Sequence, residues 1–283
     1  MHTIHLSGGV GNQLFQISFA RYLALNGFDV RVVHYTRPQA VPHTNISTFP
    51  LIEFDKVLRL KSKNIFKISE FLDPWDWKYC LPLGLDDFRK APNFVPKYFE
   101  LRNKNIIGYF QNHEILSLID EAFLSGLSQT LQNWQGQFQL DQQVTVLHVR
   151  RGDTLNPENR NSVGLLDRYY YEEAINRIGT NRLGQVVVLT DDLQEAKDLL
   201  SGLKVDVFVN PRDSNVFSAL AIMSRASNLV ASNSTLAWWG GVLANQSGGS
   251  VYIPSPFFLN AAKFASKAFR APNFSIVPAK FKD

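Results

Sequence analysis

Two adjacent arginines at mid-chain are the residues best suited to do chemistry. Arg150 and Arg151 follow the apolar run 144–149 within the segment His-Val-Arg-Arg-Gly-Asp at 148–153. A guanidinium stays charged at physiological pH and can hold a phosphate with two parallel hydrogen bonds. Because side chains alternate along a strand, we expect only one of the two arginines to face a ligand. The alternative is a solvated or ion-paired surface arginine.

A glycine-rich segment near the start could bind the same anion. Gly8, Gly9 and Gly11 separate a short apolar strand from a helical pattern that begins at Asn12. Glycines let a ligand approach the backbone, and the free N–H groups at the start of a helix attract anions. A tight strand-to-helix turn without a ligand would use the same residues, so this pattern is weak by itself.

A third segment, at 232–240, places polar side chains just before a helix. Asn233, Ser234 and Thr235 could contact phosphate, or they could cap the helix that follows. Together the three segments predict a site for a dianionic diphosphate, as in an enzyme that uses a sugar nucleotide.

Other residues of types that could bind a ligand or act in catalysis have simpler structural explanations. Asp191 and Asp192 resemble a metal-binding acidic pair, yet we expect Asp191 to cap the next helix. Trp238 and Trp239 are expected in the core rather than as a surface for stacking a sugar. The six histidines lack metal-ligand spacing and Cys80 lacks a catalytic context, so no metal site is predicted.

The elements that must position these segments alternate between strand and helix patterns. In the second half, strands are predicted at 144–149, 185–189, 205–209, 229–231 and 251–253, and helices at 168–178, 193–200, 216–226 and 235–244. Such alternation is typical of a doubly wound parallel sheet. Ligands of these sheets bind beyond the carboxyl ends of the strands, which is where the polar segments of this half lie.

The first half begins with a predicted βαβ unit. Its strands are expected at 4–6 and 30–34, with a helix at 12–25 between them, and a later strand at 106–111 precedes a helix at 112–127. Prolines interrupt the region 38–96, which we interpret as short elements and loops. The Gln-rich stretch 132–143 is the expected linker, which gives domains 1–140 and 141–283.

Composition limits the class of protein. The 283 residues are 45% hydrophobic and 19% charged, as in a folded protein of one large or two medium domains. The net charge of +4 favours an anionic ligand or an acidic membrane surface, but no dense basic stripe predicts nucleic-acid binding. With one cysteine, no signal peptide and no apolar run of about 18 residues, we expect a cytoplasmic protein that could contact the inner membrane face peripherally.

Four motifs together resemble the bacterial α-1,2-fucosyltransferases. They are Gly-Gly-Val-Gly-Asn-Gln-Leu-Phe-Gln at 8–16, Gly-Tyr-Phe-Gln at 108–111, His-Val-Arg-Arg-Gly-Asp at 148–153 and Ser-Asn-Ser-Thr-Leu-Ala-Trp-Trp-Gly at 232–240. They cover almost the whole chain in the family's order. The His-x-Arg-Arg-x-Asp element is shared with α-1,6 and protein O-fucosyltransferases, whereas the first and last motifs are more specific for the α-1,2 enzymes.

The resemblance implies an α/β, GT-B-like fold with two Rossmann-like domains whose parallel sheets face a cleft. It implies an inverting galactoside 2-alpha-L-fucosyltransferase that needs no metal or other cofactor. GDP-L-fucose would be the donor, held mainly by the C-terminal domain. A galactoside-terminated oligosaccharide or lipid-linked glycan would be the acceptor, held mainly by the N-terminal domain. The alternatives are another linkage, such as α-1,6, and a non-catalytic protein that binds a nucleotide sugar or a glycan.

The resemblance also implies roles for individual residues. The residues expected to contact the donor are Gly9, Gly11, Asn12, His148, Arg150, Asn233, Ser234 and Thr235. Arg150 would hold the β-phosphate of GDP and take up the charge that develops as GDP leaves. Asp153 and Glu158 are the candidates for the base that removes the proton of the acceptor hydroxyl. Glu158 has the spacing of the proposed base in α-1,6 enzymes, and many α-1,2 relatives lack it.

Two residues depart from the family pattern. Thr154 stands where relatives often have a tyrosine, so acceptor contacts nearby could differ. Ala219 stands where relatives often have an aspartate that can recognise guanine. Guanine recognition would then fall to Asp213, Asn215 or His148, or the donor preference would be looser.

Overall fold

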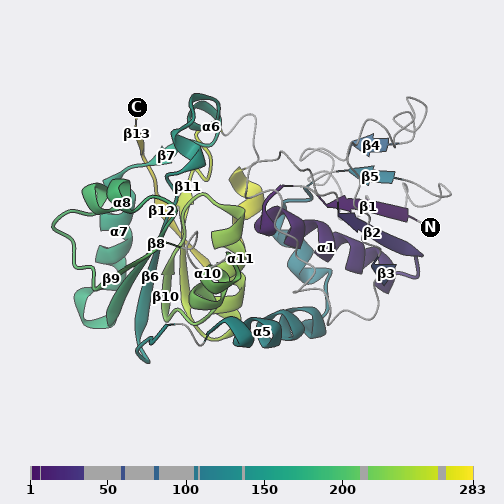
Figure 1. The fold of residues 1–283 in the computed structure, drawn as a ribbon, viewed down its shortest axis with the longest axis horizontal. Coiled ribbons are helices and arrows are strands. Elements are labelled where there is room, and N and C mark those ends of the chain that lie inside the picture. The colour runs from purple at the N-terminus through teal and green to yellow at the C-terminus, as the bar shows by residue number, and fades with distance from the viewer. Residues whose placement is uncertain are drawn as a thin grey trace. The chain divides into compact units, whose positions relative to one another are not determined.

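The computed structural model describes residues 2–6, 8–34, 59–60, 80–82, 105–107, 109–135, 138–210, 216–260 and 266–282. The chain divides into two compact α/β units, Met1–Leu127 and Ser128–Asp283 (Figure 1). This division falls within helix α5 (Glu121–Gln135). The boundary expected from the sequence, between residues 140 and 141, lies beyond the end of that helix. No described helix has the length and apolarity needed to cross a bilayer.

Within its described residues, the first unit contains a five-stranded parallel sheet in the order β3-β2-β1-β5-β4. The strands are β1 (His2–Leu6), β2 (Val30–His34), β3 (Arg59–Leu60), β4 (Cys80–Pro82) and β5 (Asn105–Ile107). Helix α1 (Val10–Leu25) connects β1 to β2 and packs on both, so the predicted βαβ unit is present. Its buried apolar side chains include Leu14, Ile17 and Leu23.

Two predictions for the first unit need correction. Helix α1 begins at Val10 rather than at Asn12, because Gly9 has extended backbone and serves as the N-cap. Consequently Gly11 and Asn12 lie inside the first turn. The predicted strand 106–111 ends at Ile107, and the predicted helix 112–127 is wrong in its first turns. There a 3-10 helix, η4 (His113–Ser117), precedes α5.

Local capping explains the second correction. The side chain of Asn112 accepts a hydrogen bond from the Glu114 N–H at 3.0 Å, which starts η4 as a separate turn. Asp120 then accepts a hydrogen bond from the Phe123 N–H at the start of α5. Because each short polar side chain binds a nearby N–H, the segment forms two helical pieces instead of one.

Within its described residues, the second unit contains a six-stranded parallel sheet in the order β12-β11-β10-β6-β8-β9. The strands are β6 (Val144–Val149), β8 (Gln185–Thr190), β9 (Val207–Val209), β10 (Asn228–Val230), β11 (Ser250–Ser255) and β12 (Phe274–Pro278). Five of them confirm the predicted strands to within two residues at each end, and the largest differences are at the start of β9 and at the carboxyl end of β11. The sequence did not predict β12.

Helices cover both faces of this sheet (Figure 1). They are α7 (Arg168–Ile178), α8 (Leu193–Leu199), α10 (Val216–Ser224) and α11 (Thr235–Gln246). Helices α7 and α8 lie on one face, and α10 and α11 lie together on the other (Figure 1). These four helices confirm the predicted ones. The sequence did not predict α6 (Pro157–Ser162) or the antiparallel pair of β7 (Leu165–Leu166) with β13 (Phe281–Lys282).

The order of the strands fixes where a ligand belongs. From β6 the chain continues to β8 and β9 on one side, and it then returns to β10, β11 and β12 on the other. The direction therefore reverses between β6 and β10, which are paired in parallel. In doubly wound sheets the ligand lies beyond the carboxyl ends of the strands at this reversal. Those ends are His148 to Arg150 and Ala231 to Ser232.

Candidate active site

His148 and Ser232 join the two strand ends at the reversal point. The Nδ1 atom of His148, near the end of β6, lies 2.8 Å from the Oγ of Ser232, just after β10. Both side chains are buried. Burial lowers the pKa of His148 to about 4; the Asp191 carboxylate opposes this shift and the Arg150 charge adds to it. The imidazole is therefore neutral near pH 7, with one ring nitrogen committed to Ser232.

The two arginines have different environments, as strand alternation predicts. Arg151 is 2% exposed, and its Nη2 donates to the Leu166 carbonyl of β7 at 2.7 Å. Its Nε makes no hydrogen bond within the described part of the chain. Arg150 is half-buried at the carboxyl edge of the sheet, close enough to His148 for its charge to act on the imidazole. Arg150 is therefore the more accessible of the two arginines, while Arg151 anchors the segment.

Asp191 and Asp192 have roles that differ from the prediction. Asp192, not Asp191, caps α8, because its Oδ1 accepts from the Glu195 N–H at 3.1 Å. The Oδ1 of Asp191 accepts from the backbone N–H of Arg151 at 2.6 Å, which ties the end of β8 to the end of β6. Across the described residues, no three His, Cys, Asp or Glu side chains gather as a metal site would require.

Two consecutive tyrosines of α7 hold the strand ends from below. The hydroxyl of Tyr171 donates to the His148 carbonyl at 3.2 Å, and that of Tyr170 donates to the Ala231 carbonyl at 2.5 Å. Tyr170 also lies 3.1 Å from the Tyr252 carbonyl of β11. Burial raises the pKa of both phenols, so both remain protonated donors. The strand ends thus belong to one hydrogen-bonded network, which holds the carboxyl edge of the sheet in place before a ligand binds.

The polar segment after β10 leads directly into α11. Asn233 is buried, and its Nδ2 donates at 3.0 Å to the carbonyls of both Val163 and Gly164. A contact between Asn233 and phosphate would therefore use its backbone N–H. Ser234 is the N-cap residue of α11, but its side chain makes no capping hydrogen bond. Thr235 is the first residue of the helix and is half-buried.

The tryptophans of the same segment belong to the core, as predicted. Trp238 and Trp239 are fully buried and pack edge to face with ring centroids 5.3 Å apart. The indole N–H of Trp238 donates to the Phe269 carbonyl at 2.8 Å. These rings therefore position the start of α11 and offer no surface to a sugar.

In the first unit, Gly8 and Gly9 form the turn that leads into α1, here called the glycine turn. Side chains from α1 and from the segment after β5 hold this turn in place. The Nε2 of Gln13 donates to the Gly8 carbonyl at 2.9 Å, and the Nε2 of Gln111 donates to Asn12 Oδ1 at 2.8 Å. Gly8 has a φ of 75°, which favours glycine. The first-turn N–H groups of α1, at Val10 and Gly11, have no partner inside the helix and could meet an anion.

Several predicted site residues lie at the limits of the described structure. Asp153 begins a 3-10 helix, η5 (Asp153–Leu155), and Glu158 lies in α6, but the side chains of both fall outside what the structure describes. Asp213 and Asn215 also lie outside the described residues. Ala219 is 1% exposed on α10, where a methyl group suits the packing.

Sequence reasoning missed the residues that brace the site. The tyrosine pair of α7 lies outside the four motifs, and although Ser232 and Gln111 lie inside them, their pairing with His148 and Asn12 was not predicted. The run of three tyrosines at 169–171, at the start of α7, was the available signal, because a buried tyrosine normally needs a partner for its hydroxyl. The partners of Tyr170 and Tyr171, however, are backbone carbonyls on distant strands.

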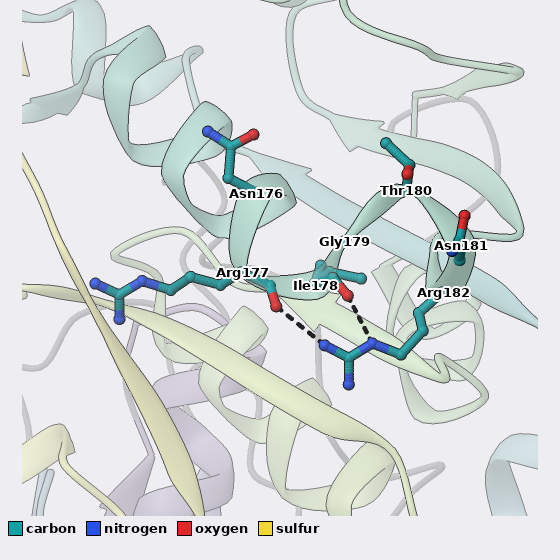
Figure 2. A pocket seen from close by; sticks show the side chains of 7 residues that line it. All are labelled: Asn176, Arg177, Ile178, Gly179, Thr180, Asn181 and Arg182. Carbon is teal, nitrogen blue, oxygen red and sulfur yellow. Dashed lines mark hydrogen bonds between the residues drawn. The ribbon is translucent and has the colours of Figure 1, made fainter.

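A hollow at the opposite edge of the second sheet has a structural explanation (Figure 2). It is lined by the end of α7 and the turn that follows, residues 176–182. Arg182 donates to the carbonyls of Ile178 at 2.7 Å and Arg177 at 3.1 Å, as Figure 2 shows, and so satisfies the end of the helix. Gln143 and Asn228 bind the Arg182 carbonyl, which places the hollow near the amino ends of β6 and β10, away from the ligand edge.

Known proteins resemble this chain in sequence and in fold. The O-antigen biosynthesis glycosyltransferase WbnK of Escherichia coli is 27% identical over 89% of this chain and 93% of its own length. Among solved structures, the E. coli ADP-heptose lps heptosyltransferase II is 11% identical, with a TM-score of 0.52 over 97% of this chain and 89% of that one. The E. coli heptosyltransferase WaaC with ADP is 10% identical, with a TM-score of 0.50 over 99% and 94%. These structures support the fold class, which is α/β and GT-B-like.

The sequence profile of Glycosyl transferase family 11 matches residues 1–275, which is nearly the whole chain. The match contains all four motifs, the whole first unit and most of the second. This chain therefore belongs to glycosyl transferase family 11, the bacterial α-1,2-fucosyltransferase family that its motifs resemble.

Proposed function

We propose that this protein transfers L-fucose from GDP-β-L-fucose to the 2-hydroxyl of a terminal galactoside, with inversion, to give an α-1,2-fucosylated glycan. Membership of a fucosyltransferase family supports the fucosyl transfer. The observation that carries the proposal is the cluster at the reversal point of the second sheet. There a half-buried Arg150 stands beside a neutral His148 that is held by Ser232.

Arg150 is the group suited to the leaving diphosphate. As the bond from fucose C1 to the β-phosphate oxygen breaks, the sugar becomes oxocarbenium-like and negative charge grows on GDP. A fixed guanidinium stabilises that charge without reorganisation, and losing one such donor typically costs about 100- to 1000-fold in rate. The backbone of Arg150 is held on both sides, because Tyr171 binds the His148 carbonyl and Asp191 binds the Arg151 N–H.

His148 contributes a neutral donor or acceptor rather than a second cation. With Nδ1 paired to Ser232, its Nε2 is the ring nitrogen left for a ligand. The pKa of about 4 keeps the imidazole uncharged when a diphosphate is absent. We propose that His148 contacts the nucleotide, while the polar segment 233–235 and the glycine turn with Gly9, Gly11 and Asn12 supply further donors to the diphosphate.

The acceptor hydroxyl must lose its proton as it attacks fucose C1 from the face opposite GDP. A carboxylate within hydrogen-bond reach would take that proton. Asp153 and Glu158 remain our candidates, since Asp153 starts η5 directly after the arginine segment and Glu158 lies in the adjacent α6. Replacing each by its amide, and measuring transfer and donor hydrolysis separately, will identify the base: the correct variant should lose transfer and keep hydrolysis.

We also propose that no metal takes part. Asp192 caps α8 and Asp191 accepts from the Arg151 N–H, so both carboxylates have structural roles that account for their presence. The acceptor would be a galactoside-terminated oligosaccharide or a lipid-linked glycan. The protein would act in the cytoplasm, in peripheral contact with the inner membrane face where the acceptor is lipid-linked.

A donor panel tests the proposal. GDP-fucose, GDP-mannose and ADP-heptose are each incubated with the protein and lactose, with and without EDTA, and nucleotide release is measured. We expect release from GDP-fucose alone, unchanged by EDTA. Release from another donor, or activity that EDTA removes and Mg²⁺ restores, would contradict the proposed donor or the metal-free mechanism respectively.

A further inference from the structure

The Gly-Tyr-Phe-Gln motif at 108–111 has no part in the donor chemistry above. Its described residues follow β5 at the carboxyl edge of the first unit's sheet. In that sheet β1 is bordered by β2 on one side and by β5 on the other. The chain passes from β1 to β2 and β3 on one side, and later supplies β4 and β5 on the other. The motif therefore lies at the reversal point of this sheet, where doubly wound sheets bind ligands.

Among the described residues of the motif, Tyr109 is the exposed one. Its side chain is 41% exposed, whereas those of Phe110 and Gln111 are 2% and 9% exposed. Phe110 stacks on Phe19 of α1, with ring centroids 4.2 Å apart and an interplanar angle of 13°. Gln111 turns toward α1 and donates to Asn12. A large aromatic side chain is thus kept at the surface while its two neighbours are buried.

The backbone of Phe110 explains how this arrangement is achieved. Its φ of 51° is in the left-handed region, which bulky residues rarely adopt. In an extended segment, Tyr109 and Gln111 would point to the same side. The left-handed residue breaks that alternation, so Gln111 points inward and Tyr109 stays outside. Backbone strain of this kind persists only when the surroundings enforce it, and it is concentrated at ligand sites.

Gly8 provides the surface on which the Tyr109 ring rests. A Cβ atom added to Gly8 would lie 3.2 Å from Cε1 of Tyr109 and 2.6 Å from Nδ2 of Asn12. The ring therefore lies against bare backbone at the start of the glycine turn. The protein therefore supports the ring at its Cε1 atom, and the side chain is still 41% exposed.

We propose that Tyr109 is a substrate-contacting residue that stacks on the galactose ring of the acceptor, an assignment that rests on the proposed function. The axial 4-hydroxyl of galactose leaves the opposite face of the sugar as a patch of C–H groups at C3, C4 and C5. A supported aromatic ring matches that apolar patch, and the phenol can bind a hydroxyl at the sugar's edge. A diphosphate would instead require cations or N–H donors, which Tyr109 does not have.

Direct binding of lactose tests this assignment without relying on turnover. Saturation-transfer NMR compares the wild-type protein with Tyr109→Ala, Tyr109→Phe and Tyr169→Ala. Tyr169 is the matched control, because it is 38% exposed on α7 and lies beneath the Lys280 ammonium. We expect Tyr109→Ala to weaken lactose binding by about tenfold, the value of one good aromatic contact. Tyr109→Phe should keep most of the affinity, and Tyr169→Ala should keep all of it.

Kinetics separate the failure of this assignment from the failure of the proposed function. In Tyr109→Ala the acceptor KM should rise by a larger factor than kcat at saturating lactose falls. Unchanged lactose affinity in Tyr109→Ala, an equal loss in Tyr169→Ala, or no lactose binding by the wild type would each overturn the assignment. A wild-type protein that binds lactose through Tyr109 but forms no fucosyl-lactose would instead refute the proposed function.

Discussion

The neutral state of His148 can be tested by replacing this histidine with glutamine. Burial, with the Arg150 charge, outweighs the attraction of Asp191 and lowers the pKa of His148 from 6.5 to about 4. Above pH 6.5 the imidazole is neutral in both the folded and the unfolded chain. As the pH falls below 6.5, the unfolded chain binds a proton that the folded chain refuses until about pH 4. Stability is therefore lost across this interval as the solution becomes more acidic.

The size of the effect follows from the shift. Each pKa unit corresponds to about 1.4 kcal/mol, so the full interval is worth about 3 kcal/mol of unfolding free energy. Urea unfolding of the wild type and of His148→Gln, each at pH 7.5 and at pH 4, isolates the contribution of His148 to the unfolding free energy. The other titrating groups are common to both proteins. The wild type should lose about 3 kcal/mol more than the variant.

NMR titration of the histidine ring protons provides the site-specific check, with the His148 signal assigned by its absence in His148→Gln. We expect that signal to stay in its neutral position from pH 8 to pH 5. A midpoint near 6.5, together with equal acid sensitivity of the two proteins, would refute the argument that the imidazole is desolvated and held neutral by its surroundings.

Three further substitutions test the carboxyl edge of the second sheet and the glycine turn. Arg150→Lys keeps the charge but loses the planar fork, so kcat in the fucosyl-transfer assay should fall about 100- to 1000-fold; a near-normal rate would remove Arg150 from the mechanism. Tyr171→Phe leaves the buried His148 carbonyl without its donor and should lower the unfolding free energy by about 1–3 kcal/mol in urea, and an unchanged value would mean that this hydrogen bond does not brace the strand end. Gly8→Ala forces a φ of 75° on alanine and a close contact with Asn12, and should cost about 1–3 kcal/mol; an unaltered melting temperature would contradict the strain argument.

The second unit could be predicted well from the sequence because its strands are short apolar runs. All six residues of β6 are buried, and polar residues follow the carboxyl ends of the strands in the sequence. Alternation along the strand also predicted that the two adjacent arginines would have different environments, and only Arg151 is fully buried. The short pair of β7 with β13 could not be predicted, because two-residue strands carry no periodicity and their partners lie at opposite ends of the unit.

Tertiary contacts account for what the sequence could not show at the site. The partner of His148 is 84 residues away at Ser232, and the left-handed backbone of Phe110 depends on packing against Phe19 of α1. The sequence near each of these residues does not predict either feature. The swap of roles between Asp191 and Asp192 has the same origin, since Asp191 is taken by a neighbouring strand end and the next residue becomes the cap.

The linkage of the product tests the central claim most directly. The protein is incubated with GDP-fucose and lactose in EDTA, and the product is analysed by NMR. We predict a single trisaccharide with an α-linked fucose on the 2-hydroxyl of galactose. Fucose on any other hydroxyl, a β-linkage, or a folded protein that releases no GDP from GDP-fucose would contradict the account.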